Sequence, residues 1–256
     1  MCNLYQMTPK EDFERYARKL NKTLVSEDYD ASRPVGPFGQ GMFLTLDGDQ
    51  LQGTMGQWGM IRPGQSSRID YIHPKAQPGK KPPAPRARST NNARIEGIDG
   101  KPTFYRAWKL GQRCLIPADW YQEPNWETGK NIWWQLKRAD GLPWTIAGLW
   151  SEWTDQETGE LVPNFTMITR NCTGHPLLGR LHKPELDPST RKPLSPEQED
   201  KRSLVQIAPE DWTRWLTGSI EEATQLLTLP EPEFFDQADA RRTDTLLAYL
   251  RDRKTT

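Results

Sequence analysis

The sequence has little cysteine and little histidine, and neither residue forms a recognisable pattern. The three cysteines, Cys2, Cys114 and Cys172, include no Cys-x-x-Cys pair, so a disulfide framework is excluded and a reducing compartment is expected. The three histidines are scattered as well. Without the ligand spacing of a metal site, we expect neither a metal nor another cofactor.

The chain also lacks a net charge and a long apolar run. Its 34 basic and 34 acidic residues cancel, so any basic surface that could meet a nucleic acid must be local. No apolar stretch approaches the length of a membrane span, and the first residues lack the apolar centre of a signal peptide. We therefore expect a soluble, cytoplasmic protein without a membrane partner.

Aromatic residues and turn residues are abundant, with 11 Trp and 22 Pro. Short apolar runs separated by turns predict strands at close intervals, while helices are expected mainly near the ends. Examples are a helix capped by Thr8, a strand at 112–117 that breaks over 118–124, and a hairpin made by 131–137 and 144–150. This order favours an α+β fold with a mostly antiparallel sheet over alternating βαβ units.

Residues 62–94 are unusually basic, with eight Lys or Arg and a single acid, Asp70. They show no periodicity, so a long loop is predicted. Two interpretations remain open, namely a solvated insertion and a cationic arm that reaches phosphates. The whole chain, residues 1–256, is expected to form one domain. It would carry this basic loop at about 62–91, a polar loop at 183–201 and a peripheral segment at 230–256 that includes a helix near 243–251.

Cys2 follows the initiator Met1, and its small side chain favours removal of that methionine. An N-terminal cysteine carries a thiol with a pKa of about 8.5 beside an amine with a pKa of about 7.7–8.0. The amine can form an imine with an aldehyde, after which the sulfur closes a five-membered thiazolidine ring. The alternative is an ordinary buried cysteine without chemistry.

Two further residues could move protons. His182 lies in a polar turn and is either a surface residue or a proton donor near neutral pH. Glu123 stands among Trp120, Tyr121 and Trp126 at the end of a strand, and is either a surface residue of a turn or a proton carrier.

Four other positions can be assigned from their local sequence. Asn92 and Arg94 are two residues apart and would point the same way from a strand, Asn92 toward a ligand or the N-terminus and Arg94 toward a phosphate. Cys114 is expected in the core, and Cys172 is expected to be partly exposed.

Several short motifs stand in an order that resembles the SOS response-associated peptidase (SRAP) family, over residues 2 to about 216. They are Met1-Cys2, Trp58-Gly59-Met60-Ile61, Asn92-Ala93-Arg94, Arg113-Cys114-Leu115-Ile116-Pro117-Ala118 leading to Glu123, Ala147-Gly148-Leu149-Trp150, Thr169 and His182. The resemblance implies mostly antiparallel β-sheets curled into a barrel-like core around the N-terminal cysteine, with peripheral helices.

The resemblance also implies a function. Family members sense abasic sites in single-stranded DNA, and Cys2 would form a thiazolidine DNA–protein crosslink once Met1 is removed. Glu123 would transfer protons during crosslinking and its reversal, His182 would assist opening of the sugar ring, and Asn92 would hold Cys2 and the sugar. Strand cleavage (lyase activity), autoproteolytic removal of Met1, a monomeric state and association with the nucleoid belong to the same expectation.

The resemblance further implies contacts to DNA from Arg94 and Trp58. Where family members begin Cys-Gly-Arg, this chain has Cys2-Asn3-Leu4, and the residue after Glu123 is Pro124 instead of Trp. A cation that normally follows the family histidine closely is also displaced, and Arg202 or Lys183 is expected to replace it.

Two other functions remain open at this point. One is a cysteine peptidase in which Cys2 is paired with His182. The other is a module that binds nucleic acid or a partner non-covalently through the basic segment 62–94.

Overall fold

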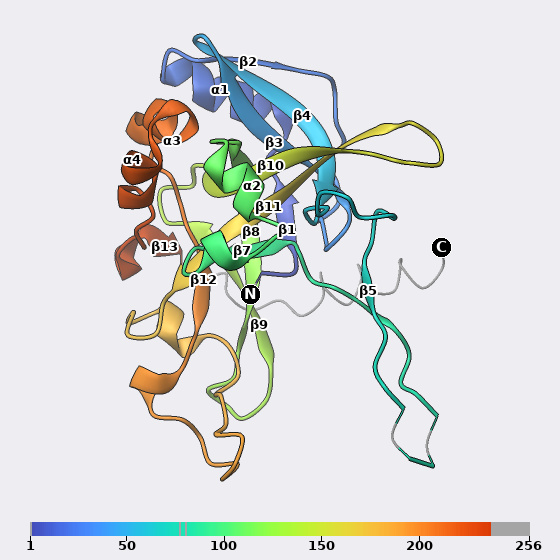
Figure 1. Cartoon of the computed structure of the whole chain (residues 1–256). Coiled ribbons are helices and arrows are strands. Elements are labelled where there is room, and N and C mark those ends of the chain that lie inside the picture. The colour runs from blue at the N-terminus through green and yellow to red at the C-terminus, as the bar shows by residue number, and fades with distance from the viewer. Residues whose placement is uncertain (1, 77, 80, 237–256) are drawn as a thin grey trace.

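The computed structural model describes residues 2–76, 78–79 and 81–236, and the helix expected near 243–251 lies outside them (Figure 1). Its strands are β1 (Tyr5–Met7), β2 (Thr23–Ser26), β3 (Gln40–Asp47), β4 (Gln50–Trp58), β5 (Tyr71–Ile72), β6 (Arg86–Ala87), β7 (Asn92–Arg94), β8 (Arg113–Asn125), β9 (Ile132–Arg138), β10 (Trp144–Thr154), β11 (Leu161–Asn171), β12 (Arg202–Leu204) and β13 (Phe235–Asp236). Its helices are α1 (Lys10–Lys19), α2 (Tyr105–Lys109), α3 (Trp212–Thr217) and α4 (Ile220–Gln225), with 3-10 turns η1 (Ile98–Gly100), η2 (Leu178–Arg180), η3 (Pro196–Gln198), η4 (Pro209–Asp211) and η5 (Pro232–Phe234).

Five strands form a closed barrel at the centre of the molecule. Their order is β10-β11-β4-β3-β8, and β8 pairs back with β10 to close the ring. The β4–β11 pair is parallel, whereas β10–β11, β3–β4, β3–β8 and β8–β10 are antiparallel. Closure removes exposed strand edges from the core. The expected α+β fold with a barrel-like core and peripheral helices is therefore confirmed.

The barrel interior is packed so tightly that one strand position requires glycine. A Cβ atom on Gly148 would lie 2.3 Å from Ile116 Cδ1 and 2.7 Å from the Thr166 carbonyl oxygen. Gly148 faces Cys114 across the β8–β10 pair, and Cys114 is fully buried as expected. Close approach of β8, β10 and β11 thus explains the glycine in the Ala147-Gly148 motif.

The helix near the N-terminus packs one face on the core, as its spacing predicts. Phe13, Tyr16 and Ala17 of α1 are buried, and the Phe13 ring stacks on Trp212 with centroids 5.9 Å apart. The predicted cap is wrong, because α1 begins after Pro9 and no side chain caps it. No helix in the part of the chain that the structure describes is long and apolar enough to cross a membrane.

Two predictions about the sheet are wrong. The run 118–124 continues strand β8, since β1 and β9 pair with it on both sides and supply its hydrogen bonds. The segments 131–137 and 144–150 are strands, but they do not form a hairpin. Instead β10 pairs with the first half of β8 and β9 with the second half, so the chain turns between two successive partners of one long strand.

The basic segment is more ordered than a loop. Its strands β5 and β6 pair with each other as a separate two-stranded sheet, and β7 joins the barrel parallel to β11. We call residues 70–88, apart from 77 and 80, the arm. Figure 1 shows the arm in teal, extending away from the barrel.

Candidate active site

Cys2 is buried in the core shortly before β1, and neighbouring amides hold its backbone. Its side chain has no exposed surface, and Sγ donates to the Leu4 carbonyl oxygen at 3.3 Å. The Cys2 carbonyl oxygen accepts hydrogen bonds from Asn92 Nδ2 at 2.8 Å and Asn91 Nδ2 at 3.0 Å. The predicted contact of Asn92 with the N-terminal region is therefore present.

Asn91 is a site residue that the sequence reasoning missed. It is fully buried, its Oδ1 accepts from Ser89 Oγ at 2.6 Å, and its carbonyl oxygen accepts from Trp58 Nε1 at 2.9 Å. Alternation along a strand assigned only Asn92 to this side. Because β7 begins at Asn92, alternation does not govern Asn91, and both amides reach the same carbonyl. The Asn91-Asn92 doublet was the available signal.

Glu123 and His182 lie together although 59 positions separate them in the sequence. Glu123 is fully buried in β8, and His182 Nδ1 lies 3.6 Å from Glu123 Oε2. The other ring nitrogen, Nε2, lies 2.6 Å from the Arg202 carbonyl oxygen, and the His182 backbone N–H donates to the Pro124 carbonyl oxygen at 2.5 Å. These contacts orient the imidazole toward the carboxylate.

The backbone of His182 has an unusual conformation. Its φ of 66° lies in the left-handed region, which a residue with a Cβ atom adopts at an energetic cost. The contact to Pro124 and a bridge between Leu181 and Asn125 hold the turn in place. Strain of this kind concentrates at functional sites.

The ring contacts of His182 also determine its hydrogen positions. A carbonyl oxygen can only accept, so Nε2 carries a hydrogen and donates it to Arg202. In the neutral imidazole Nδ1 then carries no hydrogen and faces a carboxylate oxygen. A proton bound between Nδ1 and Oε2 would turn this contact from repulsive to attractive.

Burial dominates the electrostatics of the site. It raises the pKa of the Cys2 thiol, and the nearby charge of Glu123 raises it further. Burial also lowers the pKa of His182, an effect that Glu123 partly opposes. At neutral pH the thiol therefore stays protonated and the imidazole stays neutral.

The same two causes act on Cys172. Burial and the charge of Glu123 raise the pKa of its thiol to about 12. The expectation that Cys172 is partly exposed is wrong, since only 3% of its surface is accessible.

Two of the four predicted DNA contacts are on the surface and two are not. Arg94 is exposed and pairs with Asp200 at 2.5 Å, and Lys183 Nζ is exposed above the Trp126 ring, 5.2 Å from its centroid. Trp58 and Arg202 are buried, with 0% and 4% of their surface exposed.

The two buried residues, Trp58 and Arg202, instead form hydrogen bonds with residues of the site. The Trp58 indole holds the carbonyl of Asn91, and the Arg202 carbonyl receives the hydrogen bond from His182. The Arg202 guanidinium pairs with Asp200 and Glu96.

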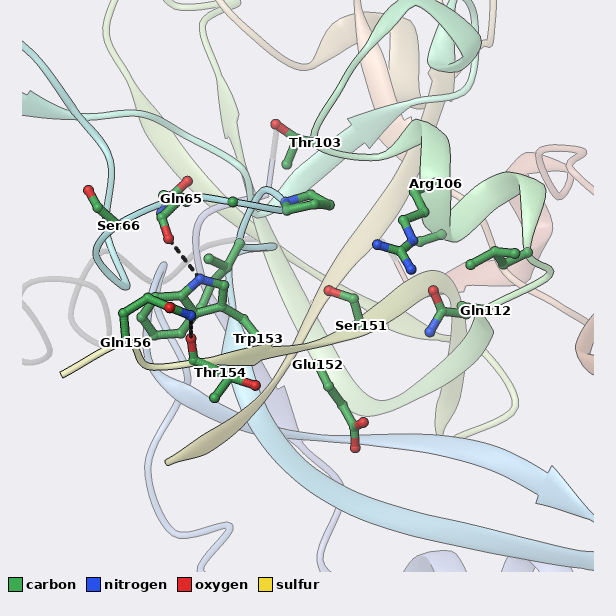
Figure 2. A pocket seen from close by; sticks show the side chains of 15 residues that line it. Gln65, Ser66, Thr103, Arg106, Gln112, Ser151, Glu152, Trp153, Thr154 and Gln156 are labelled. Carbon is green, nitrogen blue, oxygen red and sulfur yellow. Dashed lines mark hydrogen bonds between the residues drawn. The ribbon is translucent and has the colours of Figure 1, made fainter. Parts of the chain in front are cut away.

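A cavity of about 620 Å³ lies elsewhere, between α2, the end of β10 and residues 61–66 (Figure 2). Trp153 Nε1 donates to the Gln65 carbonyl oxygen on its wall at 2.9 Å, and Arg106 reaches in from α2. The residues that line it do not include Cys2, Asn92, Glu123 or His182. Within the described residues no group of His, Cys, Asp and Glu could hold a metal ion.

Solved structures share this fold. A protein from Bordetella bronchiseptica is 26% identical with a TM-score of 0.70, and the match covers 94% of this chain and 100% of that one. A protein from Bacteroides thetaiotaomicron is 20% identical with a TM-score of 0.64, covering 96% of this chain and 94% of that one. A phage-related protein from Bordetella bronchiseptica is 17% identical with a TM-score of 0.56, covering 92% of each chain. No curated protein matches the chain.

The sequence of the whole chain carries the family signature as well. The model of the family described as "SOS response associated peptidase (SRAP)" matches residues 1–245, which include Cys2, Asn92, Glu123 and His182. The chain therefore belongs to the SRAP family, which is associated with the SOS response to DNA damage.

Proposed function

We propose that this protein forms a covalent crosslink with abasic sites in single-stranded DNA through Cys2, after removal of Met1. The observation that carries the proposal is the convergence of Cys2, Asn92, Glu123 and His182 from four separate parts of the chain. An abasic deoxyribose in its ring-opened form presents an aldehyde at C1′. An N-terminal cysteine is the residue whose amine and thiol can both react with that carbon.

The amine reacts first in this mechanism. Its nitrogen attacks C1′, and protons move from nitrogen to the carbonyl oxygen until that oxygen leaves as water and an imine remains. Glu123, the buried carboxylate beside His182, can accept a proton from the nitrogen and pass it to the departing oxygen. The amides of Asn91 and Asn92 fix the Cys2 carbonyl, so the amine and the thiol keep one orientation during the attack.

The thiol closes the ring second. Because burial keeps the Cys2 thiol protonated, a base has to accept its proton as sulfur adds to the imine carbon. Glu123 is the neighbouring carboxylate that can accept this proton and pass it to the ring nitrogen. The products are one thiazolidine and one water, and the same groups would assist the reverse reaction.

The electrostatics favour this chemistry over a cysteine peptidase. A peptidase relies on a thiolate, usually beside a protonated histidine. Here the thiol is protonated, the imidazole is neutral, and the two ring nitrogens of His182 face Glu123 and the Arg202 carbonyl. Autoproteolytic removal of Met1 and strand cleavage next to the imine belong to the proposal as secondary activities, with a monomer acting on DNA in the cytoplasm.

The test uses protein from which loss of Met1 has been verified by mass spectrometry. It is incubated with a single-stranded oligonucleotide that contains one abasic site, and the products are separated under denaturing conditions. We expect a crosslinked band that disappears in Cys2→Ala and in protein with a blocked α-amine. The matched control Cys172→Ala removes another buried thiol near Glu123 and should keep the band. If the wild type gives no band, the proposal is wrong; cleavage of peptides without a band would favour the peptidase.

A further inference from the structure

The arm leaves the barrel from a fixed root. Arg68 lies just before it and pairs with Glu160 at 2.5 Å and with Asp155 at 3.5 Å, both in the turn between β10 and β11. Across the root, Arg88 Nε pairs with Asp70 at 2.7 Å, and the Arg88 N–H donates to the Asp70 carbonyl oxygen. These contacts set the direction in which the arm projects.

Beyond the root the arm carries uncompensated positive charge. Lys75, Lys81 and Arg86 are exposed, and none of them has an acidic partner among the described residues. Asp70 is the one acid in the arm's sequence, and it is already paired with Arg88. Since the chain as a whole is neutral, this charge is concentrated locally rather than spread over the surface.

The arm adds no buried side chain to the core. Every described residue from 66 to 89 is exposed or partly exposed, and Tyr71 is 49% exposed. A lone two-stranded hairpin is marginally stable in water. Its five prolines, at 74, 78, 82, 83 and 85, favour extended chain, which keeps the cations away from the barrel.

The return strand of the arm leads directly to Cys2. Ser89 follows Arg88 and its hydroxyl donates to Asn91 Oδ1, while Asn91 and Asn92 donate to the Cys2 carbonyl. The C-terminal end of the arm therefore leads into the residues that hold Cys2. An extended chain advances about 3.3 Å per residue, so Lys75, five residues beyond Asp70, can lie up to about 17 Å from the root. An oligonucleotide therefore needs several nucleotides beside the abasic site to reach the cations of the arm.

We propose that the arm binds the phosphodiester backbone of the DNA that flanks the abasic site, through Lys75, Lys81 and Arg86. This inference rests on the proposed function for the position of the damaged sugar at Cys2. The arm gives affinity that is independent of sequence and sensitive to salt, while Cys2 supplies the covalent step.

The test compares two triple variants that each remove three exposed positive charges. The arm variant is Lys75→Gln, Lys81→Gln and Arg86→Gln, and the control is Arg18→Gln, Lys19→Gln and Lys101→Gln, on α1 and near η1. Binding to an undamaged single-stranded oligonucleotide is measured by fluorescence anisotropy over a range of salt concentrations. We expect the arm variant to bind about tenfold more weakly at low salt and to lose about two from the salt slope. The control should change neither quantity by as much as half.

A second measurement uses abasic oligonucleotides of two lengths. With about four nucleotides, which are too few to reach the distal cations, the arm variant should crosslink at the wild-type rate. With long flanks at subsaturating concentration it should crosslink about tenfold more slowly. Equal affinity and equal salt slope for the arm variant and the control would overturn the inference, as would binding of an acidic protein instead of DNA. Failure of the wild type to crosslink while the arm still governs DNA affinity would overturn only the proposed chemistry.

Discussion

The candidate active site and the arm meet at Ser89 and Asn91 but are opposite in their physical chemistry. Cys2, Asn91 and Glu123 have no exposed surface, and burial keeps the thiol protonated. Lys75 and Lys81 of the arm are exposed to water, where salt screens their interactions with other charges. The molecule thus separates a buried reaction centre, held in one geometry by hydrogen bonds, from an exposed basic surface, and Ser89 and Asn91 connect the two.

The largest effect on the buried site is expected from Glu123→Gln, which keeps the size of the side chain and removes the carboxylate that can accept a proton. We expect crosslink formation and reversal to slow by about 10²- to 10⁴-fold, the usual contribution of a positioned acid or base. Single-turnover gel assays measure both directions, and circular dichroism verifies the fold. Unchanged rates in both directions would remove Glu123 from the mechanism, whereas binding of undamaged DNA should stay at the wild-type level.

A smaller effect is expected from pH, through His182. Burial lowers its pKa in the folded protein below the value of about 6.5 in the unfolded chain. The unfolded chain therefore takes up this proton first, and the contribution of His182 to stability is present above pH of about 6.5 and is lost as pH falls toward its lower folded pKa. The melting temperature of the wild type should decrease more steeply between about pH 7 and pH 5 than that of His182→Gln.

The matched control for that measurement is His73→Gln, which changes an exposed histidine of the arm. It should keep the pH dependence of the wild type. If the melting temperature of His182→Gln depends on pH as steeply as that of the wild type, burial of His182 does not contribute to the pH dependence of stability.

The smallest effect should come from removing the arm. Replacing residues 72–86 with two glycines leaves the Arg88–Asp70 root, and none of the side chains described in that range is buried. We expect the free energy of unfolding to change by less than about 1 kcal/mol, since shortening an exposed loop has a weak entropic effect. Urea denaturation measures this change, and a loss of several kcal/mol would show that the arm supports the barrel after all.

Sequence patterns predicted the parts of the fold that depend on local order. The helix α1, the α+β class and the strands around Cys114 follow from spacing and composition, and the structure confirms them. The partner of β10 could not be predicted in this way. Asp140-Gly141 turns the chain as expected. The strand that then pairs with β10 is β8, because β8 is long enough to pair with β10 along its first half and with β9 along its second half.

Two features follow from the sequence without any structure. One is the reactive group, Cys2 with an amine and a thiol on adjacent carbons, and the other is the positive charge of the arm, which contains cations but almost no acid. Tertiary structure alone decided what surrounds Cys2. Asn91 reaches its carbonyl beside Asn92, His182 lies against Glu123, and Trp58 is covered by the core. The physical reason is that composition and periodicity are local properties, whereas contacts between residues about 90 positions apart depend on strand register and barrel closure. Burial follows from those contacts, and burial sets the protonation of the thiol and the imidazole.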